Sequence, residues 1–464
     1  MDNIILPNGL TEEETHTPTS LMCWDKLLSA KRFGQEQFHD ERKHARTEFQ
    51  RDYDRLIFSA PFRRLQNKTQ VFPLPGSIFV HNRLTHSLEV SCVGRSLGNN
   101  AANGLSEKYK DTPFYSRIQE MGSIVAAACL AHDLGNPPFG HSGERAIATY
   151  FSEGNGQALK ERFSNPQHWF DLTHFEGNAN AFRLLTHQFN GRRKGGFAMT
   201  YSTLASIVKY PYASSLAEKK GKFGFFTSEK DDFVRIADEL GMIRENDKDV
   251  RYCRHPLVYL VEAADDICYQ IMDIEDAHKL KILTTEKTKE LLLGFFSKER
   301  QQHMEDVMTV VTDINEQIAY LRSCVIGLLV YECSQVFINK EDVFLAGKFE
   351  GAIIEHISEI PRKAYQTCTA TAYKYIYKSG DVLDIELAGN RIISVLLDKL
   401  THAVLYPDKA YSKLLLNKVP EQYQTGSETD FERIQAVLDY ISGMTDVYAL
   451  DLYRKINGMS LPSL

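Results

Sequence analysis

One run of thirteen residues constrains this chain more than any other feature. It reads His132-Asp133-Leu134-Gly135-Asn136-Pro137-Pro138-Phe139-Gly140-His141-Ser142-Gly143-Glu144 and follows directly on the apolar stretch Ile124 to Ala131. The apolar stretch predicts a buried helix, and Gly135 is a residue type that ends helices. An adjacent His-Asp pair at a helix end can place an imidazole nitrogen and a carboxylate oxygen on one divalent cation. The alternative is that His132 is a core histidine that caps the helix while Asp133 is solvated.

Two further segments carry residues of the same chemistry. His86 stands at the head of a segment whose apolar positions recur at helical spacing. Much later, residues 257–274 form an apolar helical stripe, and Asp265, Tyr269 and Asp273 occupy a second face at i, i+4 and i+8. Such a row suits the wall of a site. Charged rows on helices are also commonly solvated, so the pattern alone leaves both interpretations open.

Together, His86, His132-Asp133 and Asp265 reproduce the H…HD…D signature of the HD superfamily, so the chain resembles metal-dependent phosphohydrolases. Longer blocks resemble, more narrowly, the bacterial dGTP triphosphohydrolase (dGTPase) family. These blocks lie in order between about residues 46 and 395, at residues 62–74, 83–90, 132–144, 174–179, 209–212 and 386–389. Several long blocks in the right order are far more specific than one short motif.

The resemblance implies a mainly α fold, with an HD-domain helical core and additional C-terminal helices. It also implies a divalent cation, Mg²⁺ or Mn²⁺, with Fe²⁺, Ni²⁺ or Zn²⁺ as alternatives. Two imidazoles and two carboxylates suit Mn²⁺, Fe²⁺ or Ni²⁺ better than Mg²⁺, so the metal stays open. The implied ligands are His86, His132, Asp133 and Asp265.

By the same resemblance, the reaction converts a deoxynucleoside triphosphate (dNTP) and water into a deoxynucleoside and inorganic triphosphate. We expect dGTP as the substrate, with the base preference open. His141 and Glu144 match the catalytic pair at the α-phosphate, and which of them donates the proton is undecided. Gln70 and Asp273 match the family's contacts to the 3′-hydroxyl, and Arg83, Lys209 and Tyr210 match its phosphate-side groups. Tyr269 is the further candidate for contact with the sugar.

The ring of Tyr269, packed against C2′, would leave no room for a 2′-hydroxyl. The expected partners are the dNTP, a nucleotide activator, single-stranded DNA and further copies of the chain in a hexamer or tetramer. Two rival interpretations remain. One is another HD phosphohydrolase, such as a phosphodiesterase or a guanosine tetraphosphate hydrolase. The other is a nucleotide-regulated protein that binds single-stranded nucleic acid.

Length and composition bound the architecture. With 464 residues the chain exceeds the usual size of one domain, so we predict an N-terminal arm (1–45), a catalytic core (46–285) and a C-terminal helical region (286–464) that packs on the core. A dense stretch of β-branched and aromatic residues around Lys378 to Asp381 predicts a small hairpin.

The sequence has no feature of a secreted or membrane protein. Its eight cysteines include no C-x-x-C pair, and the N-terminus lacks a signal pattern. The apolar run Cys324 to Val330 is too short to span a bilayer. We therefore expect a soluble cytoplasmic protein with no membrane partner.

The formal net charge of −7 argues against a surface built wholly for nucleic acid. One basic stretch stands out against it: Arg42, Lys43, Arg46, Arg51, Arg55, Arg63, Arg64 and Lys68. It suits a patch that faces a polyanion such as single-stranded DNA, and it equally suits the solvated face of an amphipathic helix. Arg46 is also a candidate for the triphosphate.

Overall fold

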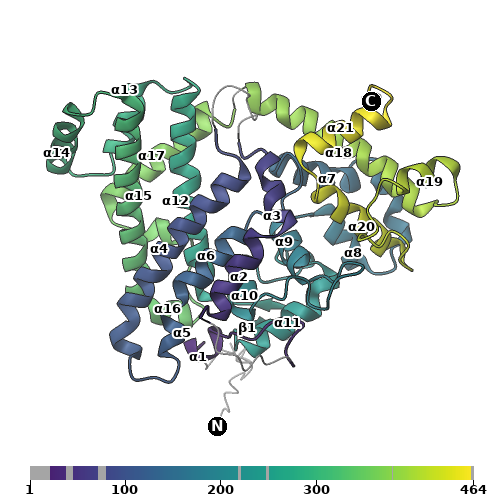
Figure 1. The fold of residues 1–464 in the computed structure, drawn as a ribbon, viewed down its shortest axis with the longest axis horizontal. Helices are drawn as coiled ribbons and strands as arrows, with labels where there is room; N and C mark the ends of the chain where they lie inside the picture. The colour runs from purple at the N-terminus through teal and green to yellow at the C-terminus, as the bar shows by residue number, and fades with distance from the viewer. Residues whose placement is uncertain are drawn as a thin grey trace, which may run out of the picture.

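The computed structural model describes residues 21–37, 45–71, 80–217, 221–246, 250–378 and 380–460 (Figure 1). Within them lie 21 α-helices, five short 3-10 helices and one two-stranded antiparallel sheet. The mainly α fold predicted from the sequence is confirmed. Most of the predicted N-terminal arm lies outside the described residues, as do Arg42 and Lys43.

The larger of two hydrophobic cores surrounds α6 (Met121–Ala131), in which every residue except Ser123 is buried. A helix that is apolar on all sides has to be covered on all sides. It packs against the following four helices: α2 (Glu48–Ile57), α4 (Arg83–Tyr109), α10 (Tyr201–Ile207) and α12 (Pro256–Lys279).

Glycines let α4 and α6 cross closely. A Cβ atom on Gly98 would lie 2.7 Å from the Cα of Gly122, and one on Gly94 would lie 2.5 Å from the Sγ of Cys129. Both contacts are too short for any larger residue without a shift of the helices. The two helices run antiparallel at this crossing, which brings the first turn of α4 to the C-terminal end of α6.

The smaller core contains residues from the middle and the end of the chain. It is built mainly from α7 (His141–Ser152), α8 (Pro166–Thr173), α18 (Gly380–Leu405), α20 (Asp430–Ser442) and α21 (Asp446–Ile456). In Figure 1 these helices lie on the right, whereas α4, α12 and α15 (Ile314–Asn339) of the larger core lie on the left. The run 132–144 begins where α6 ends and continues into α7, so it joins the two cores.

The remaining elements are short or peripheral. The α-helices are α1 (Trp24–Leu27), α3 (Ala60–Arg64), α5 (Tyr115–Ile118), α9 (Gly177–Thr186), α11 (Lys230–Glu239), α13 (Thr285–Leu293), α14 (Lys298–Thr309), α16 (Glu341–Leu345), α17 (Glu359–Tyr375) and α19 (Ala410–Leu416). The 3-10 helices are η1 (Leu65–Asn67), η2 (Asn155–Arg162), η3 (Ser214–Leu216), η4 (Thr227–Glu229) and η5 (Ile353–His356).

The small sheet pairs β1 (Arg244–Asn246) with β2 (Arg251–Tyr252). The hairpin predicted around Lys378 to Asp381 is wrong, because α17 and α18 occupy the sequence on either side of that point. The aromatic and β-branched residues there belong to helix faces: Thr371 is buried, whereas Tyr373 is exposed. Tertiary packing on a helix has overridden strand propensity.

Among the described helices, only α15 is long and apolar enough to cross a membrane by length and composition. It packs against α4, α12 and α13. Its residue Arg322 also forms an ion pair of 2.5 Å with Glu275 of α12. These contacts are those of a helix at the side of a protein core.

Candidate active site

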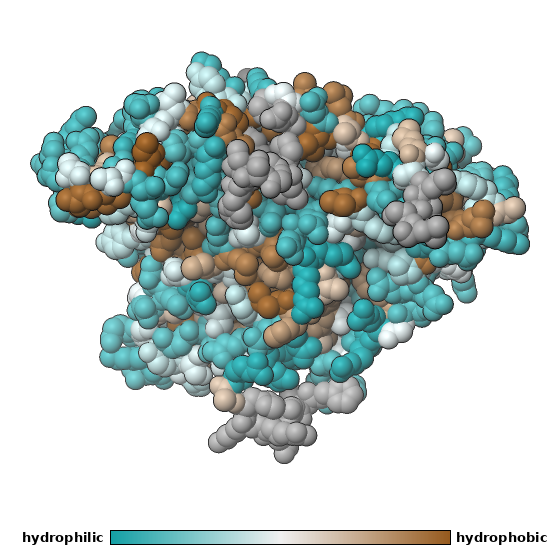
Figure 2. All heavy atoms as spheres, turned by 45° about the horizontal axis from the view of Figure 1, so that its top comes forward, coloured by the Kyte–Doolittle hydropathy of each residue, from teal (hydrophilic) through white to brown (hydrophobic). Residues whose placement is uncertain are grey.

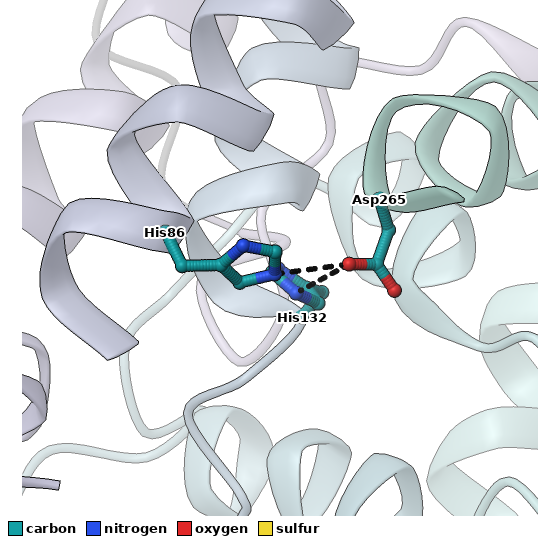
Figure 3. Close-up of side chains that lie close together, drawn as sticks. All are labelled: His86, His132 and Asp265. Atoms are coloured by element: carbon teal, nitrogen blue, oxygen red, sulfur yellow. Dashed lines mark hydrogen bonds and ion pairs between the residues drawn. The ribbon is translucent and has the colours of Figure 1, made fainter. Parts of the chain in front are cut away.

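Two histidines and one aspartate converge where α4, α6 and α12 meet (Figure 3). His86 lies in the first turn of α4, His132 follows the last residue of α6, and Asp265 lies near the middle of α12. His86 Nε2 is 3.0 Å from Asp265 Oδ1, and His132 Nε2 is 3.6 Å from the same oxygen. One ligand atom from each residue lies within 4.8 Å of the other two. With metal–ligand bonds of about 2.0–2.2 Å, the three atoms can reach one cation.

Local contacts hold this triad of His86, His132 and Asp265. His132 Nδ1 donates a hydrogen bond to the carbonyl oxygen of Cys129 at 2.6 Å, which leaves Nε2 as the free ligand atom. Burial would lower the pKa of His132, but Asp133 and Asp265 raise it to about 9. Burial would likewise raise the pKa of Asp265, but His132 and His86 hold that pKa well below its usual range. The carboxylates thus create a negative potential that favours a cation.

Asp133, the fourth predicted ligand, lies beside the triad but faces other partners. Its Oδ2 is 2.9 Å from Arg83 Nη1 without hydrogen-bond alignment, and its Oδ1 accepts a hydrogen bond from Asn136. The distance from Oδ1 to His132 Nε2 is 3.7 Å. A buried carboxylate oxygen without a hydrogen-bond donor suits a metal site. The triad itself does not include Asp133, so its role as a ligand stays a prediction.

At the start of α7, His141 and Glu144 form a second pair. His141 Nδ1 donates to Glu144 Oε2 at 3.0 Å, and the backbone N–H of Gly177 donates to Glu144 Oε1 at 2.8 Å. Burial would raise the pKa of Glu144, but His141, Lys222 and the Gly177 N–H lower it to about 2. Glu144 is therefore a buried, ionised acceptor. The side chain of His141, by contrast, is 64% exposed.

Gly177 begins α9 at a point where no side chain fits. A Cβ atom there would lie 2.2 Å from Asn136 Oδ1 and 2.4 Å from Glu144 Oε1. The same helix holds the run 132–144 through Asn180, whose amide donates to the carbonyl of Gly135 at 2.7 Å. The sequence block 174–179 thus positions Glu144.

The triad and the His141–Glu144 pair open into one cavity of about 360 Å³. That volume lies at the lower end of the range of small-molecule sites. All the site residues predicted from the sequence except Asp273 line it: Gln70, Arg83, His86, His132, Asp133, His141, Glu144, Lys209, Tyr210, Asp265 and Tyr269.

Sequence reasoning missed part of the cationic wall of this cavity. Lys209, which was predicted, forms an ion pair of 2.8 Å with Glu262. Lys222, which was not, lies 2.7 Å from Glu176 Oε1 and 3.6 Å from Glu144 Oε2. Glu176 and Asn178 also line the cavity, within a block that the sequence singled out without giving these residues a role. The only signal for Lys222 is its position between Gly221 and Gly224, in a segment that looks like a loop.

The wall on the α12 side combines Tyr269 with a residue from the C-terminal part of the chain. The ring of Tyr377 stacks on Tyr269, with the centroids 5.9 Å apart. Tyr377 also donates a hydrogen bond of 2.6 Å to Asp273 Oδ2. Burial raises the pKa of Asp273 to about 8. Asp273 is thus placed behind Tyr269 and Tyr377, outside the residues that line the cavity. Gln70, which lines the cavity, has a buried Oε1 that finds no hydrogen-bond partner among the described residues.

Elements of the smaller core fix the loop between α6 and α7. Asp446, at the start of α21, accepts hydrogen bonds from the backbone N–H of Phe139 at 2.9 Å and of Thr69 at 2.8 Å. Phe139 has a positive φ of 63°, which is strained for a residue with a side chain. Its ring lies against Gly389 of α18, where a Cβ atom would come within 2.8 Å of the ring. The block 386–389 thus serves this packing.

This fold and site are those of an HD-type protein. Residues 83–200 match the HD domain, and residues 356–455 match the phosphohydrolase-associated domain. Asp265, the third member of the triad, lies between these two matched segments.

Relatives with similar sequences span nearly the whole chain. The deoxyguanosinetriphosphate triphosphohydrolase-like protein of Synechocystis sp. is 40% identical over 455 residues, which cover 95% of this chain and 100% of the relative. A protein of the same description from Pseudomonas aeruginosa is 37% identical over 460 residues, with 95% and 100% covered. The deoxyguanosinetriphosphate triphosphohydrolase of Yersinia enterocolitica is 30% identical over 511 residues, with 93% and 98% covered. The chain therefore belongs to the deoxyguanosinetriphosphate triphosphohydrolase family of HD-domain hydrolases, and the resemblance inferred from the sequence is confirmed.

Proposed function

We propose that this protein hydrolyses a dNTP, with dGTP as the first candidate, to the deoxynucleoside and inorganic triphosphate. The observation that carries the proposal is the coexistence, in one cavity, of a His-His-Asp triad, a hydrogen-bonded His–Glu pair and the cationic side chains of Arg83, Lys209 and Lys222. Relatives named for triphosphate release from deoxyguanosine triphosphate support the reaction class.

A divalent cation fits the donor set of His86, His132 and Asp265, with Asp133 beside it. When bound there, such an ion supplies Lewis acidity at a phosphate oxygen and acidifies a bound water. Mg²⁺ and Mn²⁺ are the first candidates, and Fe²⁺, Ni²⁺ and Zn²⁺ are the alternatives.

We assign the proton transfer to His141 and the positioning role to Glu144. Both oxygens of Glu144 are already engaged, one by the Gly177 N–H and one by His141 Nδ1. The bond from Nδ1 leaves Nε2 of the exposed imidazole directed away from Glu144 and available to the substrate. His141 would protonate the departing 5′ oxygen or orient the nucleophile, and the ionised Glu144 would stabilise the imidazolium form.

The remaining lining residues divide between the two ends of a nucleotide. Arg83, Lys209 and Lys222 would offset the charge of the triphosphate, and the Tyr210 hydroxyl would contribute a hydrogen bond. Tyr269 would exclude a 2′-hydroxyl by its bulk. Gln70, with its unpartnered Oε1, is the better placed of the two predicted 3′-hydroxyl contacts, because Asp273 already accepts from Tyr377.

Product analysis tests the reaction directly. We expect dGTP to yield deoxyguanosine and tripolyphosphate, whereas a phosphodiesterase-like or tetraphosphate-hydrolase-like activity would yield monophosphate, phosphate or pyrophosphate. His141→Ala should lose turnover, and His402→Ala, an exposed histidine of α18, is the matched control. Release of any product other than tripolyphosphate would reject the proposal. All four dNTPs and GTP, alone and in mixtures, would establish the base preference and any activation by a second nucleotide.

We also propose a homo-oligomer, a hexamer or tetramer, in the cytoplasm. Exposed apolar side chains support association: Tyr373 and Tyr375 on α17, and Leu383 and Leu387 on α18. Figure 2, in which the end of the molecule that carries α17 and α18 comes forward, shows hydrophobic residues among the hydrophilic ones there. All eight cysteines are free thiols, as in a reducing compartment. Light scattering on Leu387→Glu should give a smaller mass than on the native chain.

A further inference from the structure

The basic stretch noted in the sequence contains one side chain that is buried and lacks a counter-charge. Arg46 pairs with Asp54. Arg51 pairs with Glu48 at 2.6 Å. Lys68, by contrast, is 2% exposed and forms no ion pair within the described part of the chain. Its ammonium group instead donates hydrogen bonds to two backbone carbonyls, at 2.6 and 2.7 Å. The main chain therefore holds this buried cation.

A packing role does not account for a buried ammonium group at this position. Burial lowers the pKa of Lys68 to about 7, although Asp446 raises it, and this shift reflects the cost of removing the charge from water. A methionine of similar length would fill the same space without that cost. The two hydrogen bonds are what the ammonium group adds.

The first carbonyl belongs to Asn136, in the loop between α6 and α7. The side-chain amide of Asn136 donates to Asp133 Oδ1, beside the triad. Its Oδ1 lies only 2.2 Å from the place that a Cβ atom of Gly177 would take, and the N–H of Gly177 donates to Glu144. The hydrogen bond from Lys68 thus fixes the backbone of a residue that contacts both Asp133 and the start of α9 behind Glu144.

The second carbonyl belongs to Ser442, the last residue of α20. Asp446 follows at the start of α21 and accepts hydrogen bonds from the N–H groups of Thr69 and Phe139. Two neighbouring residues, Lys68 and Thr69, therefore hold the joint between α20 and α21. The same joint holds the loop between α6 and α7 at Phe139.

The backbone of Lys68 ties this point to α4 as well. Its carbonyl accepts a hydrogen bond of 3.2 Å from the N–H of Arg83, the first residue of α4, and His86 lies in the same turn. The next residue, Thr69, forms an isolated β-bridge with Asn82. Lys68 thus joins three parts of the molecule: the end of α4 that carries His86, the loop between α6 and α7, and the C-terminal helices.

We propose that Lys68 is a positioning residue for the reaction proposed above, and the inference rests on that function. Its two hydrogen bonds hold the loop at a fixed place relative to α4, so that Asp133 and Glu144 face the triad. The described residues that line the cavity do not include Lys68, so it acts through the loop. Lys209 and Lys222, on the phosphate side, belong to other segments. Loss of the ammonium group should therefore lower kcat and leave KM nearly unchanged.

Kinetics of Lys68→Met and Lys68→Arg test the proposal on the full chain. We expect kcat for dGTP to fall by about 10- to 100-fold in Lys68→Met, with KM changed by less than about threefold. Lys68→Arg should recover most of the rate, because the guanidinium keeps donors for both carbonyls and a cavity of about 20 Å³ beside Lys68 gives room for the larger group. Lys413→Met, at an exposed position of α19, is the matched control and should equal the native chain.

Hydrogen–deuterium exchange at residues 132–144 gives a readout that does not depend on turnover. Exchange there should be faster in Lys68→Met and close to native in Lys68→Arg, while the circular dichroism spectrum stays unchanged. If the native chain released a product other than tripolyphosphate, the proposed function would fail, whereas the exchange result would still hold.

Three outcomes would overturn the proposal. One is native kcat in Lys68→Met. Another is native exchange at residues 132–144 in a Lys68 variant that has lost turnover. The third is a loss of turnover that equals the loss of folded protein, which would make the role of Lys68 purely structural. If Lys68→Met does not fold, Lys68→Gln carries the same test, because its side chain is one bond shorter and leaves at least one of the two carbonyls without a donor.

Discussion

Gly177→Ala gives the sharpest test of the His141–Glu144 pair, because it adds one carbon atom at a known place. The new Cβ would lie 2.2 Å from Asn136 Oδ1 and 2.4 Å from Glu144 Oε1, whereas ordinary contacts begin at 3.4 Å. The carboxylate therefore has to move by about 1 Å, away from the Gly177 N–H and out of line with His141. A displacement of about 1 Å in a catalytic group costs on the order of 10²-fold in rate. The overpacking itself should cost about 1–3 kcal/mol of stability.

Kinetic and spectroscopic measurements separate the loss of turnover from the loss of stability. We expect kcat for dGTP to fall about 10²-fold while the circular dichroism spectrum and bound metal stay unchanged, since Gly177 touches no member of the triad. Gly327→Ala is the matched control, because a Cβ at this exposed position of α15 meets nothing within 4 Å. It should leave kcat unchanged and stabilise the chain by about 0.5–1 kcal/mol. Native turnover in a folded Gly177→Ala protein would refute the role assigned to the pair.

Three further substitutions test His132, Tyr269 and the N-terminal cap of α12. His132→Ala should lose bound Mn²⁺ and turnover together while the helical fold persists, which elemental analysis and circular dichroism would check; retained metal would exclude His132 as a ligand. Tyr269→Ala should raise the ratio of GTP to dGTP turnover in steady-state kinetics by opening space at C2′, and an unchanged ratio would mean that this ring does not read the sugar. His255 caps α12 by accepting the N–H of Leu257, and burial lowers its pKa to about 4. Because the unfolded chain binds this proton near pH 6.5, the free energy of unfolding should fall as the pH drops from about 6.5 to about 4, by on the order of 3 kcal/mol. Urea titrations of His255→Asn should show a shallower pH dependence, and an equal slope would exclude this histidine as its source.

The sequence predicted the features of the site that depend on local helical spacing or follow from the family resemblance. The apolar stretch before His132 indicated a buried helix, and the i, i+4, i+8 spacing put Asp265 and Tyr269 on one face of α12. Both features depend on helical geometry, which holds within a few turns of chain. The role of Asp273 stays a prediction. The pattern could not show that Tyr377, about a hundred residues later, donates a hydrogen bond to this carboxylate and stacks on Tyr269.

The sequence also did not predict which residues from distant parts of the chain contact Glu144. Lys222 reaches Glu144 only because the chain folds back past α9 and α10, and no local spacing encodes that approach. Gly177 was visible as part of a block, yet the need for a glycine there appears only when the side chains of Asn136 and Glu144 are in place. The hairpin prediction near Lys378 was wrong for the opposite reason. It relied on local strand propensity alone, whereas packing on helices sets the conformation of these residues.

The position of the site between the two cores explains why the C-terminal part of the chain contributes to it. The segment that matches the HD domain, residues 83–200, supplies His86 and His132 but neither Asp265 nor the cavity wall at Tyr269. The segment that matches the phosphohydrolase-associated domain supplies Tyr377 at that wall and Asp446 at Phe139 and Thr69. Phe139 sits in a strained conformation that its surroundings must enforce. Without α18 and α21, the loop that leads to His141 would lose both the packing of Phe139 at Gly389 and the hydrogen bond to Asp446. The C-terminal helices are therefore structural parts of the candidate active site, since they hold its loop in place.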